Sequence, residues 1–235
     1  MTMRKRVIPL AIVSMLASCA SSNTGPKSMT SADVPVSRQT QSCFAPIPGH
    51  PTSAEQHAFV TEVSRLAIAA ERNHGVPAAA IAAMAIQESG YGWTTLAQHT
   101  NDILAWKYTT ASATGGRDFW VLNCGTSSDR YIVFADRSQA VDFVAQQLAT
   151  SSNYMAATNR YRQDRTQDVA VVEAVNRWLD DIAAPYSTQP DAYRTAIKRI
   201  MNDPFAPSDR QSADQNLYHL SESVQTVRST EAVAH

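Results

Sequence analysis

The sequence predicts a mainly helical α+β domain with one small β-hairpin. Three observations predict this class: apolar residues recur at helical spacing over much of the chain, two short β-forming runs flank a turn, and polar segments lie on both sides of the part that carries these patterns. Of the 235 residues, 44% are apolar and 17% are charged, which suits one globular domain of average size with flexible ends. The formal net charge of −1, without a basic stripe, argues against a nucleic-acid partner.

Residues 1–18 have the pattern of an export signal. A basic start, Arg4-Lys5-Arg6, precedes an apolar run that is too short for the ~20 residues of a membrane span. The run ends in LASC at Cys19 and resembles a bacterial lipobox, which implies that Cys19 is the lipidated first residue of the mature protein. The residue after Cys19 is not Asp, which implies the outer membrane. A plain secretory leader is the alternative, and it also exports the protein.

Two polar segments flank the expected globular domain, which spans residues 52–203. Residues 19–51 are rich in Ser, Thr, Pro and Gln and are expected to form a flexible tether. Residues 204–235 are expected to form a disordered tail, with at most a frayed helix near Leu217 to Val224.

The first predicted helix of the domain has apolar residues at helical spacing from Phe59 to Ala70. Ser53 and Gln56 form a capping-box pattern before it, and Gly75 marks its end.

The second predicted helix runs from Ala79 and ends at Gly90 and Gly92, because Gly is costly inside a helix and favourable where φ turns positive. It is nearly all apolar, which predicts burial, and it carries Glu88 at its end. Burial of a carboxyl raises its pKa and favours the protonated form that a general acid needs. An ordinary Glu that caps the helix or pairs with an arginine is the alternative.

The remaining elements follow in order. The patterns predict a short helix over 93–100, a hairpin of runs 117–123 and 130–134, and three further helices over 134–149, 166–181 and 190–201.

Two cysteines remain if Cys19 is lipidated. In an oxidising compartment, Cys43 and Cys124 predict a possible disulfide, which would stabilise the fold by about 4 kcal/mol by closing a loop of about 80 residues. Two thiols and six scattered histidines do not favour a metal site, and no cofactor is expected.

Four blocks resemble the glucosaminidase domain, glycoside hydrolase family 73. ESGYGWTTLA from Glu88 resembles the ESGWGxSxLA signature, and NDILAWKY from Asn101 resembles a segment that lines the sugar cleft in that family. The block over 134–154 and the closing segment PYSTQPDAY from Pro185 also match. The resemblance covers about 52–202 and implies a lysozyme-like fold, with a cleft between the helical domain and the hairpin lobe.

The resemblance also implies a function. It implies a peptidoglycan hydrolase that cuts the β-1,4 bond after N-acetylglucosamine, with Glu88 as general acid and Tyr186 at the family's cleft tyrosine. Its partners would be glycan strands and, through the lipid on Cys19, a membrane. The residues expected to contact the sugar are Tyr91, Asn101, Trp106, Tyr108, Asn123 and Tyr154.

One feature departs from the family pattern. Family members often carry a second Glu on the first strand of the hairpin, and Asn123 stands in its place here, with Asp118 and Asp129 as nearby carboxylates. The departure favours a substrate-assisted route, in which the substrate's own N-acetyl group acts as the nucleophile.

Two other functions stay open. A lytic transglycosylase uses the same kind of Glu but normally has a Gly-Leu-Met-Gln-like segment downstream, which this sequence lacks. A non-catalytic peptidoglycan-binding lipoprotein would fit the missing second Glu, although it would gain nothing obvious from the buried acid Glu88.

Overall fold

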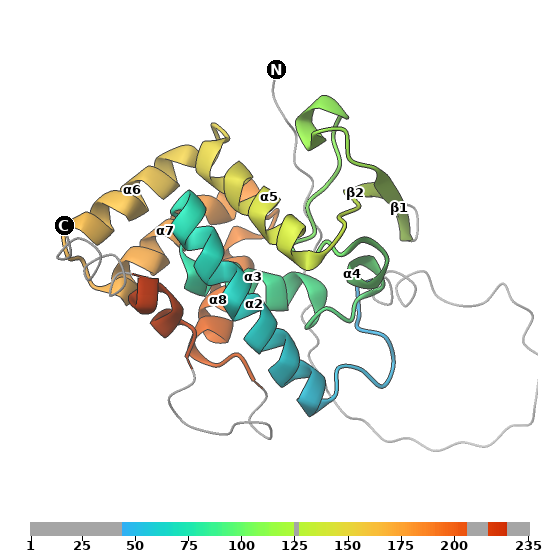
Figure 1. Cartoon of the computed structure of the whole chain (residues 1–235), viewed down its shortest axis with the longest axis horizontal. Helices are drawn as coiled ribbons and strands as arrows, with labels where there is room; N and C mark the ends of the chain where they lie inside the picture. Colours follow the sequence, from blue (N-terminus) through green and yellow to red (C-terminus); the bar gives the residue numbers. More distant parts are fainter. Residues whose placement is uncertain (1–43, 125–126, 206–215, 225–235) are drawn as a thin grey trace, which may run out of the picture.

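The structure is a computed structural model, and it describes residues 44–124, 127–205 and 216–224 (Figure 1). The predicted class is confirmed: the described chain is a helical body with one antiparallel hairpin. Its elements are α2 (Ser53–His74), α3 (Ala78–Ser89), α4 (Thr95–Thr100), the 3-10 turn η1 (Ser112–Thr114), β1 (Phe119–Cys124), β2 (Ser127–Ile132), α5 (Arg137–Thr150), α6 (Met155–Thr166), α7 (Val171–Tyr186) and α8 (Pro190–Asn202).

Helix α3 lies at the centre of the helical body, where α2, α7 and α8 pack around it (Figure 1). Every residue from Ala78 to Ile86 is buried, as its apolar sequence predicts. Because most of these side chains are alanines, the neighbouring helices can approach closely. The burial of α3 therefore fixes the position of its last turn, which carries Glu88.

Helix α2 begins one residue earlier than predicted. Its capping box uses Thr52 and Glu55 rather than Ser53 and Gln56: the Glu55 N–H donates to the Thr52 hydroxyl at 3.3 Å, and the Thr52 N–H donates to the Glu55 carboxylate at 2.7 Å. The predicted stop is confirmed, because Gly75 caps the helix in the left-handed conformation.

The region 155–186 differs most from the prediction. Helix α6 was not expected, because its exposed face is long and polar and only Ala157, Thr158, Tyr161 and Asp164 are buried. The helix expected over 166–181 is α7, which begins later and continues to Tyr186 with Pro185 in its last turn.

The hairpin packs on a second, smaller apolar cluster formed by Leu96, Leu122 and Tyr131. In its register Trp120 lies opposite Tyr131, and Leu122 lies opposite Asp129. Phe44 also packs against this cluster, so the hairpin, α4 and the start of the described chain share one small core.

The segment before α2 lies on the turn between α3 and α4. The Ile47 N–H donates to the Trp93 carbonyl at 2.9 Å, and the His50 ring stacks on the Trp93 ring with centroids 3.8 Å apart. The last residues of the segment expected as a tether, 44–51, are therefore held against the domain.

The predicted leader and Cys19 lie outside the described residues. Cys124 is disulfide-bonded. Both other cysteines, Cys19 and Cys43, are outside the described ranges, so the pairing of Cys43 with Cys124 stays a prediction.

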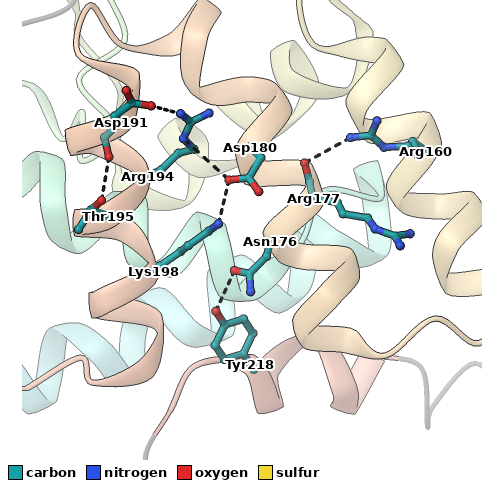
Figure 2. Close-up of polar contacts among 9 residues, drawn as sticks. All are labelled: Arg160, Asn176, Arg177, Asp180, Asp191, Arg194, Thr195, Lys198 and Tyr218. Carbon is teal, nitrogen blue, oxygen red and sulfur yellow. Dashed lines mark hydrogen bonds and ion pairs between the residues drawn. The ribbon is translucent and has the colours of Figure 1, made fainter.

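The C-terminal segment 216–224 is part of the folded domain. A helix lies where one was expected near Leu217 to Val224, but it packs against the domain and is not a frayed part of a disordered tail. Its apolar residues Leu217, Leu220 and Val224 are buried. Figure 2 shows the Tyr218 hydroxyl donating to Asn176 of α7, at 3.0 Å. Beside it, Asp180 forms an ion pair with Lys198 of α8 at 2.8 Å (Figure 2).

A buried acid, Glu71, holds this segment in place. Its carboxyl accepts hydrogen bonds from the Ser221 hydroxyl, the Tyr161 hydroxyl and the Ala78 N–H, each at 2.7 Å. Burial raises the pKa of Glu71, and these three donors oppose the rise. Glu71 thus joins α2, α3, α6 and the C-terminal segment at one point.

Candidate active site

Glu88 is positioned by a sharp turn at the end of α3. The Ser89 hydroxyl donates to the Ala85 carbonyl at 2.6 Å and accepts from the Gly92 N–H at 2.8 Å. Gly90 caps the helix at φ 54°, and a Cβ there would lie 2.7 Å from the Pro46 ring. The glycine is therefore required both by its backbone conformation and by the close approach of the N-terminal segment.

The partly buried carboxyl of Glu88 has a raised pKa. Burial raises it from 4.5 to about 7, while the hydroxyl of Tyr193 on α8 acts in the opposite direction through a hydrogen-bonding interaction. This interaction is weak, because the Tyr193 hydroxyl makes no hydrogen bond of regular geometry within the described chain. With a pKa of about 7, Glu88 keeps a substantial protonated fraction at neutral pH, as a general acid requires.

Four aromatic side chains from different parts of the chain gather beside Glu88. The Tyr186 and Tyr193 rings stack with centroids 5.4 Å apart, and Trp106 and Tyr154 lie 6.2 and 6.4 Å from Tyr186. Burial raises the pKa of Tyr186 and Tyr193, and the charge of Glu88 adds to the rise in both. Both tyrosines therefore stay neutral phenols near Glu88.

The cluster is fixed by hydrogen bonds to the backbone. The Tyr186 hydroxyl donates to the Leu104 carbonyl at 2.8 Å, and the Tyr154 hydroxyl donates to the Pro185 carbonyl at 3.2 Å. The structure thus brings together four residues expected at the site from the sequence: Glu88, Trp106, Tyr154 and Tyr186.

Asn101 and Tyr108 hold the connection between α4 and the hairpin. Asn101 ends α4 at φ 55°, and its side-chain amide donates to the Phe134 carbonyl at 3.0 Å. Tyr108 pairs with β2 through its N–H, which donates to the Arg130 carbonyl at 2.9 Å, and its ring lies 4.8 Å from that of Phe119.

Tyr91 and Asn123 lie in other surroundings. The Tyr91 hydroxyl donates to the Pro204 carbonyl at 2.5 Å, and its ring meets the Phe59 ring edge-on. Asn123 is exposed near the end of β1, on the face of the hairpin opposite to the one that carries Leu122 into the core.

Sequence reasoning missed a second buried acid, Asp102. It is 1% exposed, and burial raises its pKa well above the usual range, with the charge of Glu88 adding to the rise. Tyr131, which is fully buried, has a raised pKa from burial and from the charges of Asp129, Glu88 and Asp102. The sequence feature that could have pointed to Asp102 is its position next to Asn101, in a segment that resembles the family's cleft segment.

The two carboxylates singled out from the sequence lie on or near the hairpin. Asp118 is exposed just before β1, and Asp129 forms an ion pair with Lys107 at 2.9 Å. Among the described residues, no three His, Cys, Asp or Glu side chains are grouped to hold a metal ion.

An acid of raised pKa, held beside aromatic side chains on a mainly helical domain, has the features of a general acid in a glycoside hydrolase. A family model described as Glucosaminidase, mannosyl-glycoprotein endo-beta-N-acetylglucosaminidase, matches residues 64–204. The chain belongs to this glucosaminidase family.

Among solved structures, the chain is similar to the catalytic domain of the autolysin Auto from Listeria monocytogenes. The two are 13% identical, the match covers 75% of this chain and 90% of that one, and the TM-score is 0.49. No curated protein matches the chain.

Proposed function

We propose that this protein is a peptidoglycan hydrolase that cleaves the β-1,4 glycosidic bond after N-acetylglucosamine, with Glu88 as the general acid. The observation that carries the proposal is the position of Glu88 at the end of a buried helix with a pKa of about 7. Membership of the glucosaminidase family supports the bond type.

Cleavage begins when protonated Glu88 gives its proton to the leaving glycosidic oxygen, as the sugar ring becomes oxocarbenium-like. The family's second carboxylate has no counterpart at Asn123, so the substrate's N-acetyl oxygen attacks the anomeric carbon in its place as the glycosidic bond breaks. Water then opens the resulting oxazolinium ring, and the ionised Glu88 takes the proton of the water. Tyr186, which the family resemblance puts at the cleft, is assigned to hold this group. It is 5% exposed and its O–H donates to the Leu104 carbonyl, which leaves a lone pair of the hydroxyl to accept the acetamido N–H.

Trp106 offers an apolar face to the sugar. Its side chain is half-buried, so its ring can take the C–H surface of a sugar, whereas Tyr154 is 1% exposed and supports Trp106 from the core, with ring centroids 6.2 Å apart. The other residues expected from the sequence to contact the glycan are Tyr91, Asn101, Tyr108 and Asn123. They lie outside the aromatic cluster beside Glu88, and their contacts with the glycan stay predictions.

The export signal and the lipobox-like sequence at Cys19 support anchoring in a membrane, with the outer membrane preferred. Within the part of the chain that the structure describes, no helix is long and apolar enough to cross a bilayer. Replacing Cys19 by Ala should move the exported protein from the membrane fraction to the soluble fraction. If the protein stays in the membrane fraction, the lipid anchor is wrong.

The test is digestion of purified sacculi by residues 20–235 and by the Glu88→Gln variant, with products identified by mass spectrometry. Fragments ending in reducing N-acetylglucosamine, made by the wild type and lost in Glu88→Gln, are expected. Glu173→Gln, which changes an exposed acid of α7, is the matched control and should keep activity.

Other products would contradict the proposal. A 1,6-anhydro muramic end would identify a lytic transglycosylase. If both proteins sediment with sacculi and neither releases fragments, the protein either binds peptidoglycan without cleaving it or needs an activator.

A further inference from the structure

Residues 106–108 run beside β2 and widen the hairpin. The Tyr108 N–H donates to the Arg130 carbonyl at 2.9 Å, and Lys107 forms a β-bridge with Tyr131. Side chains alternate between the two faces of a sheet, and directly paired residues share a face. Because Lys107 and Tyr131 share one face, Tyr108 and Arg130 lie on the other.

This second face of the widened sheet begins in the aromatic cluster beside Glu88. Trp106 lies two residues before Tyr108 and therefore on the same face, and its ring centroid is 6.2 Å from that of Tyr186. Two residues of a strand span about 7 Å, so Tyr108 follows Trp106 at roughly that distance. A substrate that lies on Trp106 can therefore continue along this face.

Strand β1 adds apolar side chains to the same face. Val121 is paired with Arg130, and Phe119 lies two residues before Val121. Of the four large apolar residues that are exposed in the described part of the chain, these two, at 39% and 42%, lie side by side here. We call this surface the Trp106 face, and its residues are Trp106, Tyr108, Phe119, Val121 and Arg130.

Arg130 gives the Trp106 face a positive charge. The side chain is exposed, and its guanidinium lies over two rings, 5.1 Å from the centroid of Phe119 and 5.9 Å from that of Tyr108. Among the described residues Arg130 forms no ion pair, because the neighbouring Asp129 lies on the opposite face and pairs with Lys107. A cation that two rings hold in place, and that no acid neutralises, can bind an anion from solution.

The proposed substrate carries groups that fit this face. In intact peptidoglycan, short peptides with free carboxylates and small alkyl side chains branch from the lactyl groups of the glycan. A guanidinium can bind such a carboxylate through two N–H groups, and Phe119 and Val121 offer apolar contact to the alkyl groups. A bare glycan has carboxylates on its lactyl groups, but it lacks the alkyl side chains for these two residues, so the peptide is the better fit.

We propose that the Trp106 face binds the acidic peptide that branches from the glycan, with Arg130 pairing with a peptide carboxylate. Arg130 is then a specificity-determining residue that directs the enzyme to glycan that still carries its peptides. The inference rests on peptidoglycan as the proposed substrate.

Binding tests this inference without any assay of cleavage. Residues 20–235 carrying Glu88→Gln are sedimented with intact sacculi, with sacculi whose peptide carboxylates have been converted to amides, and with sacculi stripped of their peptides by an amidase. Adding Arg130→Gln should weaken binding to intact sacculi by about threefold to tenfold and leave binding to the other two unchanged. Arg130→Lys keeps the charge and should lose less than Arg130→Gln.

The control and the contrary results are equally specific. Arg65→Gln removes the charge of an exposed arginine on α2 and should bind all three preparations as its parent does. The proposal is wrong if Arg130→Gln binds every preparation as its parent does, or if it weakens binding to intact and amidated sacculi alike. A loss on stripped sacculi alone would assign Arg130 to the lactyl carboxylate and overturn the peptide assignment.

The same experiment separates this inference from the proposed function. If none of the proteins sediments with any preparation, peptidoglycan is not the ligand and both proposals fail. If binding follows the expected pattern while the wild type releases no fragments, the assignment of a hydrolase fails and the peptide site stands.

Discussion

At the scale of single residues, the raised pKa of Glu88 suits a general acid but lowers the free energy of unfolding at neutral pH. Its pKa rises from 4.5 to about 7 on folding, so the folded protein binds this proton more tightly than the unfolded chain does. Stability is therefore highest below pH 4.5 and falls as pH rises toward 7. At about 1.4 kcal/mol per unit of pKa, the loss attributable to Glu88 is about 3 kcal/mol.

The Glu88→Gln variant should accordingly be more stable than the wild type where Glu88 is ionised. We expect its free energy of unfolding in urea to exceed that of the wild type by up to about 3 kcal/mol at about pH 8, and the difference to disappear at about pH 4. Glu173→Gln, at the surface, should show no such pH-dependent gain. Equal stabilities of Glu88→Gln and wild type at both pH values would mean that Glu88 is not buried as described.

At the scale of elements, the turn after α3 depends on the contact between Gly90 and Pro46. A Cβ at Gly90 would lie 2.7 Å from the Pro46 ring, whereas a Cβ at Gly116 would meet nothing within 4 Å. Both glycines have positive φ, at 54° and 75°, so Ala at either position carries the strain of a left-handed residue. The difference between the two sites isolates the steric contact.

We expect Gly116→Ala to cost about 1 kcal/mol and Gly90→Ala to cost about 2–3 kcal/mol of unfolding free energy. Because the clash displaces the segment that holds the end of α3, Gly90→Ala should also lower activity on sacculi. If the two variants lose the same unfolding free energy, the contact between Pro46 and a Cβ at position 90 has no effect on stability.

The C-terminal segment is joined to the domain by the hydrogen bond from Ser221 to Glu71. Ser221→Ala removes one donor from the buried Glu71 carboxyl and also the acceptor of the Ala79 N–H, so we expect a loss of about 1–3 kcal/mol in unfolding free energy. Ser223→Ala is the matched control, because Ser223 donates only within its own short helix, to the Leu220 carbonyl. If both variants unfold at the same urea concentration, the Glu71 contact contributes nothing to stability.

The sequence predicts well the helices that have one buried apolar face and a clear residue at which the helix ends. Helix α2 and its end at Gly75 follow from periodic apolar residues and a left-handed cap. Helix α6 could not be found in this way, because most of its residues are polar and face the solvent. Asp102 was missed for a related reason: its neighbours in sequence do not reveal that it is buried, or that its charge acts on Tyr131 and Tyr186, far along the chain.

At the scale of the whole molecule, a disulfide ties the hairpin to the rest of the chain. Cys124 is bonded, and Phe44 packs on the same cluster as the hairpin, so Cys43 is the expected partner. Reduction should lower the unfolding free energy by up to about 4 kcal/mol, because a loop of about 80 residues is opened. Peptide mapping of the unreduced protein should recover a peptide pair joined through Cys43 and Cys124. A pair joined through Cys19 would refute the assignment.

The two ends of the described chain meet opposite ends of the same helix. At the start of α3, the Ala79 N–H donates to the Ser221 hydroxyl at 3.2 Å; at its other end, Pro46 lies against Gly90. Segments from both ends of the described chain therefore contact the helix that carries Glu88, one at each end of the helix. Displacing either segment would therefore remove a contact from one end of the helix that carries Glu88.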